Sequence, residues 1–338
     1  MTIIKTKAKI IAEAGVNHNG NLKLAFKLID AAAKTGADYV KFQTGIPDLS
    51  ISSYAKKARY QIKNTGKKEN QLEMVKKITL PIVDFKKLKN YANKKKIKFL
   101  STPFDVISLK FLNTLNMDFI KIPSGELTNF PFLKEIAKLK KKVILSTGMS
   151  NLKEIKKTLQ VLTKYGTKKK NIIVLQCNTE YPTPYEDVNL KAMNTIRANF
   201  QVNVGLSDHS DGIEVPLAAI ALGAKIIEKH LTLDRKMKGP DHLASLEPKE
   251  FTQMVKSIRN IEKSLGNGKK ILSKSEKKNI NIARKSIVAF KNIAKGEILT
   301  QFNLTTKRPG TGLSPMLWKN VLGKKAKKFF HKDELIKI

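Results

Sequence analysis

Cysteine is nearly absent from this sequence of 338 residues. The single cysteine, Cys177, excludes an internal disulfide and a cysteine-based metal cluster. A chain with so little cysteine is typical of a reducing compartment, so we expect a cytoplasmic protein.

Long apolar runs and export signals are also missing. None of the apolar runs approaches the roughly 20 residues that a membrane-spanning helix needs. The N-terminal residues 1–16 pass from a few lysines into a short β-like run, without the apolar core and small-residue cleavage site of a secretory signal. We therefore expect neither export nor a membrane partner.

Acidic residues are scarce: 28 Asp and Glu stand against 65 Lys and Arg, which gives a net charge of +37. Such an excess suggests nucleic acid. However, the lysines are scattered over helical stretches such as 86–98 and 164–170, without interleaved aromatics or a nucleic-acid-binding motif. We expect no nucleic-acid partner and interpret the charge as a solvated surface that attracts anionic substrates. A basic nucleic-acid-binding protein without catalysis is the alternative.

Eight short β-like runs recur along the chain, each separated from the next by enough residues for a helix. Leu24, Leu28 and Ala32, which precede Gly36, show the helical spacing in the first gap. This alternation predicts parallel strands in an α/β fold, a (β/α)8 TIM barrel. The β-like runs are 9–16, 39–44, 98–103, 119–124, 142–148, 172–177, 202–209 and 224–232.

An open doubly wound sheet is the rival architecture. It should carry a glycine-rich dinucleotide turn after the first strand, where this chain has Asn17, His18, Asn19 and Gly20. We therefore predict a barrel over 1–265, a polar linker over 266–280 and a small β-rich domain over 281–338.

Polar residues follow nearly every predicted strand. In a β/α barrel the reactive groups gather at the carboxyl ends of the strands, so these residues are the candidates for a site. Ordinary strand-end polarity is the alternative for any one of them. The candidates are Glu13, Asn17, Lys41, Gln43, Thr102, Lys121, Ser124, Glu126, Thr179, Glu180, Tyr181, Ser207, Asp208, His209, Glu228 and His230.

Two lysines lie midway along apolar runs, Lys41 and Lys121. A buried ammonium costs several kcal/mol unless it meets an anion. With the hydroxyls of Thr102, Ser124 and Ser207, the two lysines indicate a phosphate-binding cradle.

Two histidines, His209 and His230, end neighbouring predicted strands. Two imidazoles with oxygen ligands suit Mn²⁺ or a similar divalent ion. Two histidines at this spacing are a weak signal when taken alone.

Most of the candidate residues belong to motifs that together resemble the sialic acid synthases over essentially the whole chain. The motifs are IAEAGVNHNG (11–20), KFQT (41–44), LSTPFD (100–105), KIPSGE (121–126), STGM (146–149), YPTP (181–184), GLSDHS (205–210), EKH (228–230), GPDH (239–242) and KRPG (307–310).

This resemblance implies an enzyme that condenses phosphoenolpyruvate with an amino-sugar aldehyde and releases phosphate. It implies a metal at His209 and His230, most often Mn²⁺, with Mg²⁺ or Co²⁺ as alternatives. The phosphoenolpyruvate contacts match Lys41, Thr102, Lys121, Ser124 and Ser207. The catalytic positions match Glu13, Glu126, His209 and His230, and the sugar contacts match Gln43, Thr179, Tyr181, Asp241 and Arg308.

The same resemblance implies a C-terminal antifreeze-like (SAF) domain and a domain-swapped homodimer. In such a dimer Arg308 reaches the sugar site of the partner chain.

The identity of the sugar depends on two features of the sequence. Thr179 stands two residues before the YPTP tyrosine, where N-acetylneuraminate synthases typically have Asn, and 55–74 looks closer to the N,N'-diacetyllegionaminate synthases. We expect 2,4-diacetamido-2,4,6-trideoxymannose as the substrate. N-acetylmannosamine, the substrate of N-acetylneuraminate synthases, is the alternative, and pseudaminate synthesis is a further one.

Overall fold

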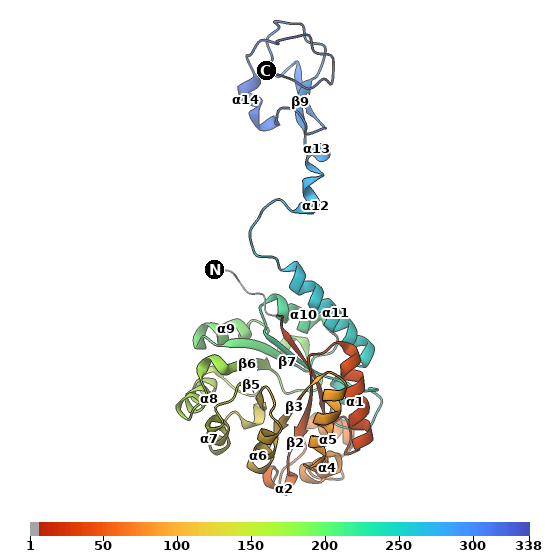
Figure 1. The fold of residues 1–338 in the computed structure, drawn as a ribbon, viewed down its shortest axis with the longest axis vertical. Helices are drawn as coiled ribbons and strands as arrows, with labels where there is room; N and C mark the ends of the chain where they lie inside the picture. Colours follow the sequence, from red (N-terminus) through yellow and green to blue (C-terminus); the bar gives the residue numbers. More distant parts are fainter. Residues whose placement is uncertain (1–6) are drawn as a thin grey trace. The chain divides into compact units, whose positions relative to one another are not determined.

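The chain divides into two units in the computed structural model, which describes residues 7–338 (Figure 1). The first unit ends at Asn267 and the second spans Gly268–Ile338. Two short helices, α12 (Lys274–Lys277) and α13 (Ile280–Ala283), lie within and just after the predicted linker.

Parallel strands form the centre of the first unit. They are hydrogen-bonded in the order β3-β2-β1-β8-β7-β6-β5-β4. Strands β3 and β4, at the two ends of this order, lie side by side, so the sheet curls into a nearly closed barrel. This confirms the predicted (β/α)8 barrel and excludes the doubly wound sheet. The strands are β1 (Lys9–Gly15), β2 (Tyr39–Thr44), β3 (Lys98–Pro103), β4 (Ile120–Ile122), β5 (Val143–Ser146), β6 (Ile172–Cys177), β7 (Asn203–Asp208) and β8 (Ile226–His230).

Helices surround these strands in Figure 1. The first helix begins where Asn21 accepts hydrogen bonds from the backbone N–H groups of Lys23 and Leu24, and it ends at Gly36, whose φ of 80° is left-handed. The helices that follow the eight strands are α1 (Leu22–Thr35), α5 (Asp84–Lys94), α6 (Val106–Thr114), α7 (Phe130–Lys138), α8 (Leu152–Lys164), α9 (Ala192–Phe200), α10 (Glu214–Ala221) and α11 (Pro248–Ser264).

The core lies between the strands and the helices. Leu28 and Ile29 of α1 and Phe85 and Leu88 of α5 are fully buried against the strands. Helix positions spaced three and four residues apart therefore face the sheet, as the sequence predicts.

One connection departs from the strand-helix alternation, namely residues 45–83 between β2 and α5, which we call the β2–α5 segment. It contains three short helices, α2 (Pro47–Ser50), α3 (Arg59–Thr65) and α4 (Gln71–Ile78). Single turns of 3-10 helix occur in four other loops of the barrel unit: η1 (Ser124–Glu126), η2 (Lys169–Asn171), η3 (Tyr185–Asp187) and η4 (His242–Ala244).

The register of the strands brings the predicted site residues to one level. Glu13 on β1 pairs with Lys41 on β2 and with His230 on β8. Ser207 on β7 pairs with Glu228 on β8. The carboxyl ends of the strands therefore form one polar face of the barrel.

The second unit has its own small apolar core. Its antiparallel strands, β9 (Ser286–Ala289) and β10 (Leu304–Lys307), are followed by η5 (Pro315–Leu317) and α14 (Trp318–Val321). Ile287, Ile293 and Phe330 are fully buried in this core.

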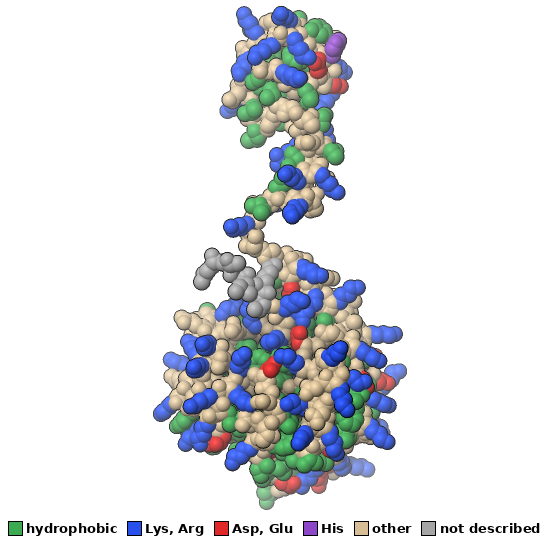
Figure 2. Space-filling view, in the orientation of Figure 1, with side chains coloured by type: hydrophobic (Ala, Val, Ile, Leu, Met, Phe, Trp, Pro, Cys, Tyr) green, Lys and Arg blue, Asp and Glu red, His purple; other side chains and the backbone are tan. Residues whose placement is uncertain are grey.

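Basic side chains cover the surface in view. Figure 2 shows lysine and arginine spread over the visible face of the barrel unit, with few acidic side chains between them. Over residues 7–338, no helix combines the length and the apolar character that crossing a bilayer requires.

Candidate active site

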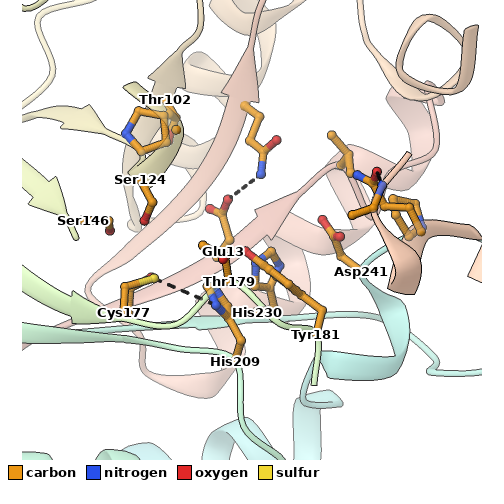
Figure 3. Close-up of a pocket in the computed structure, with 18 of the residues that line it drawn as sticks. Glu13, Thr102, Ser124, Ser146, Cys177, Thr179, Tyr181, His209, His230 and Asp241 are labelled. Atoms are coloured by element: carbon orange, nitrogen blue, oxygen red, sulfur yellow. Dashed lines mark hydrogen bonds between the residues drawn. The ribbon is translucent and has the colours of Figure 1, made fainter. Parts of the chain in front are cut away.

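A cavity of about 490 Å³ opens at the carboxyl ends of the barrel strands. The residues with a predicted catalytic or binding role line it, except Glu126 and Arg308, whereas the strand-end candidates Asn17 and Asp208 do not. Figure 3 shows Thr102 and Ser124 on one side and Asp241 on the other, with Glu13, Tyr181 and the two histidines between them. The predicted residues that line the cavity are Glu13, Lys41, Gln43, Thr102, Lys121, Ser124, Thr179, Tyr181, Ser207, His209, His230 and Asp241.

Four buried charges lie at the base of the cavity. Lys41 Nζ is 2.9 Å from Glu13 Oε2 and 3.6 Å from Glu228 Oε1. Lys121 Nζ donates to the same Glu228 oxygen at 3.1 Å. These side chains are at most 6% exposed, so each charge depends on its partners rather than on water.

Hydroxyl groups complete this cluster. Lys41 Nζ donates to Thr102 Oγ1 at 2.8 Å, and Ser207 Oγ donates to Glu228 Oε1 at 3.2 Å. Ser124 Oγ accepts a hydrogen bond from the backbone N–H of Gly148 at 2.9 Å, which fixes the Ser124 side chain on the same side of the cavity as Thr102. The two lysines and three hydroxyls predicted as an anion cradle therefore converge in one place.

The pKa values of the cluster favour a bound anion. Burial raises the pKa of Glu13 in spite of the attraction of Lys41. Burial lowers the pKa of Lys121, because the pull of Glu228 does not fully compensate for the lost water and Lys41 repels the ammonium. An anion placed between the two lysines would raise the pKa of Lys121 again.

The two histidines lie next to one another on the cavity, with their rings tilted by 51°. Their ring centroids are 5.3 Å apart, and His209 Nδ1 lies 2.6 Å from the carbonyl oxygen of Asn178. A hydrogen bond there places a proton on Nδ1, so Nε2 carries a lone pair when the ring is neutral. Burial lowers the pKa of His209, but Cys177 and this carbonyl outweigh it and raise the pKa. Burial and repulsion by His209 lower the pKa of His230 far below its usual range, so this ring is neutral.

Several buried polar atoms of the cavity lining have no hydrogen-bond partner within residues 7–338, among them His230 Nδ1, Glu228 Oε2 and Ser146 Oγ. Over the same residues, no three His, Cys, Asp or Glu side chains gather as a metal cluster. The pair of imidazoles fits a divalent ion only if oxygen atoms of the substrate and of water supply the other ligands.

A buried ion pair behind the cavity fixes the strand ends that carry the histidines. Lys229 Nζ, on β8, donates to Asp208 Oδ2 at 2.5 Å and to the Ser210 carbonyl at 2.6 Å. Asp208 Oδ1 accepts from both the backbone and the hydroxyl of Ser210. Because 208 and 229 immediately precede His209 and His230, this pair links the two strand ends that carry both rings.

An aromatic stack forms another wall. The ring of Tyr60 lies 4.8 Å from the ring of Tyr181, which lies 4.0 Å from that of His209. Sequence reasoning named Tyr181 and His209 but missed Tyr60, because Tyr60 comes from α3 and not from a strand end.

Two predicted residues lie elsewhere. Glu126 is in η1, beside the cavity-lining Gly125, and its carboxylate accepts from Asn129 Nδ2 at 2.6 Å. Arg308 belongs to the second unit, where its Nε donates to the Ala283 carbonyl at 3.0 Å.

Several lining residues carry no predicted role. Glu228 was a strand-end candidate without an assigned function, yet it bridges both lysines. Cys177 lines the cavity beside His209, and nothing in the sequence pattern singled it out for the site. The β2–α5 segment adds Tyr60, Met74, Val75 and Ile78.

The sequence matches known proteins over nearly its full extent. Residues 28–270 match the NeuB family, and residues 284–338 match the SAF domain. The chain belongs to the NeuB family. This confirms the resemblance to sialic acid synthases and the predicted C-terminal SAF domain.

Two relatives and one solved structure show how similar the chain is to known proteins. The chain is 56% identical to N,N'-diacetyllegionaminic acid synthase of Campylobacter jejuni, over 98% of this chain and 99% of that protein. It is 43% identical to the enzyme of the same name from Legionella pneumophila, over 93% and 89% of the two chains. A crystal structure of N-acetylneuraminic acid synthetase from Leptospira borgpetersenii aligns with a TM-score of 0.70 and 36% identity, over 83% of this chain and 94% of that one.

The buried Asp241 makes folding stability depend on pH. Burial raises its pKa from 3.8 to about 7, with His209 opposing and Glu13 adding to the shift. Between these pH values the folded chain keeps a proton that the unfolded chain releases, so this residue destabilises the fold increasingly as pH rises through that range.

In chelator-treated protein, Asp241→Asn should gain stability relative to the wild type from about pH 4 to pH 7, and the gain should level off above pH 7. Urea unfolding at several pH values checks this, and a constant stability difference would contradict it.

Proposed function

We propose that this protein condenses phosphoenolpyruvate with an N-acetylated amino-sugar aldehyde to form a nine-carbon sialic-acid-like nonulosonate and phosphate. The observation that carries the proposal is the buried pair of lysines in the anion cradle, which lies beside two adjacent imidazoles in a NeuB-family barrel. We infer 2,4-diacetamido-2,4,6-trideoxymannose as the sugar, from the full-length similarity to two N,N'-diacetyllegionaminic acid synthases. N-acetylmannosamine remains the alternative.

The cradle would hold phosphoenolpyruvate by its two anionic ends. Lys41 and Lys121 are charge-assisted donors, and Thr102, Ser124 and Ser207 add hydroxyl groups around them. Fixing both the phosphate and the carboxylate points C3 of phosphoenolpyruvate toward the histidine side of the cavity.

The two imidazoles would hold a divalent ion, with Mn²⁺ preferred over Mg²⁺ and Co²⁺. When bound there, the ion would polarise the aldehyde carbonyl of the sugar as a Lewis acid. The Nε2 lone pair that neutral His209 offers and the unpartnered Nδ1 of His230 support this assignment.

Glu13 would stabilise positive charge and transfer a proton during the reaction. As C3 of phosphoenolpyruvate bonds to C1 of the sugar, C2 gains positive character, which Glu13 is placed to stabilise. Water then adds at C2, and its proton passes by way of Glu13, whose pKa burial raises, to the alkoxide formed at C1 of the sugar. The bond between C2 and the phosphate oxygen breaks last, as the new C2 hydroxyl gives its proton to the departing phosphate and becomes the ketone.

Phosphate release tests the proposed reaction. With phosphoenolpyruvate and Mn²⁺, we expect rapid release with 2,4-diacetamido-2,4,6-trideoxymannose and much slower release with N-acetylmannosamine. Mass spectrometry should find the nine-carbon acid. The reverse preference would identify an N-acetylneuraminate synthase, and no release with any amino sugar would refute the proposal.

Metal removal tests the role of the histidine pair. Chelation should abolish turnover, and added Mn²⁺ should restore it, whereas His209→Ala/His230→Ala should lose at least about a hundredfold in kcat and gain nothing from Mn²⁺. Mn²⁺ should also raise the melting temperature of the wild type but not that of the double variant. Full activity of the double variant would remove the metal from the mechanism.

We further propose a cytoplasmic homodimer in which Arg308 of one chain serves the sugar site of its partner. Lys121→Ala and Arg308→Ala should each be nearly inactive alone. After the two variants exchange subunits, each heterodimer contains one site with both residues intact, so activity should return. A dimer that shows no complementation would assign Arg308 to its own chain, and a monomer by sedimentation would refute the pairing.

A further inference from the structure

The β2–α5 segment lines one side of the cavity with mostly apolar side chains, and the amides of Gln61 and Gln71 lie among them. Met74, Val75 and Ile78 of α4 face the cavity, and Met74 is only 2% exposed. Met74 and Ile78 are four residues apart, and so they lie on the same face of the helix. Tyr60 of α3 continues this surface, which we call the apolar wall (Tyr60, Met74, Val75 and Ile78).

The apolar wall is firmly held. Lys57 is buried and donates to Thr65 Oγ1 at 3.0 Å, with Glu69 Oε1 3.7 Å away. Asn70 and Glu73 form a capping box at the start of α4. Asn64 Nδ2 donates to the Pro240 carbonyl at 2.7 Å, which ties α3 to the loop that carries Asp241.

These contacts locate the apolar wall with respect to the reacting groups. Thr102 and Ser124 lie on the opposite side of the cavity from Asp241 in Figure 3, and the wall is tethered beside Asp241. Two successive ring spacings, 4.8 and 4.0 Å, separate Tyr60 from His209. A six-carbon sugar whose C1 lies at the histidines would therefore extend its far end toward the wall.

We propose that Met74, Val75 and Ile78 form the subsite for C6 of the sugar and select a methyl group there over a hydroxymethyl group. This inference rests on the proposed function and deepens it. The wall gains contact with a methyl group, whereas a 6-hydroxyl group placed against it loses hydrogen bonds to water and finds aliphatic carbon instead. The amide of Gln71, which also lines the cavity, suits the 4-acetamido group of the same sugar.

A pair of sugars that differ only at C6 isolates this effect. Phosphate release is measured with 2-acetamido-2,6-dideoxymannose and with N-acetylmannosamine, for the wild type and for Val75→Thr/Ile78→Thr. The wild type should prefer the 6-deoxy sugar roughly ten- to a hundredfold in kcat/KM. In the double variant the new hydroxyl groups can bind the 6-hydroxyl group, so the preference should fall below about threefold, mainly through KM.

Matched controls separate the subsite from general damage. Val83→Thr makes the same exchange at a position that is 62% exposed and outside the cavity lining, and it should keep the wild-type preference. If circular dichroism shows that the double variant is misfolded, Val75→Thr alone should still reduce the preference by at least threefold.

A wild type that treats both sugars equally, or a folded variant that keeps the full preference, would overturn the proposal. Release of no phosphate with any amino sugar would instead overturn the synthase function itself.

Discussion

Two carboxylates and two ammonium groups meet inside the barrel, where water can hardly reach them. Isolated burial of any one charge would cost several kcal/mol, so each must lie within reach of an opposite charge. Glu228 satisfies this requirement for both lysines, and Glu13 satisfies it again for Lys41. The arrangement demands that strands β1, β2, β4 and β8 keep their register. The phosphate and carboxylate groups of a substrate can replace the carboxylates of Glu13 and Glu228 as partners of these lysines.

Around this cluster, different elements of the fold contribute different parts of the site. The strand ends supply the anion cradle and the two imidazoles, and the Lys229–Asp208 pair links the two strand ends that carry both rings. The β2–α5 segment lies outside the strand-helix alternation and lines the far side of the cavity with Tyr60 and α4. A segment of this kind can change its side chains without disturbing the charge cluster, which makes it a suitable place for selection between sugars.

Much of the fold and of the site could be predicted from sequence, for identifiable physical reasons. Buried parallel strands read as apolar runs, and three of the predicted runs, 39–44, 98–103 and 172–177, coincide with β2, β3 and β6. Strand β4 is shorter than its run because Pro123 has no N–H to donate, and the chain turns into η1. Lys41 and Lys121 were conspicuous because an ammonium in an apolar run needs an anion.

The sequence by itself determined the barrel, the SAF domain and the polar strand ends, because strand period and motif order are local properties of the chain. Only the tertiary structure decided that Glu228 bridges the two lysines and that α4 lines the cavity. These contacts join residues separated by tens to hundreds of positions, and α4 has the amphipathic pattern of an ordinary surface helix. Which face of such a helix meets a cavity depends on packing, which no local pattern records.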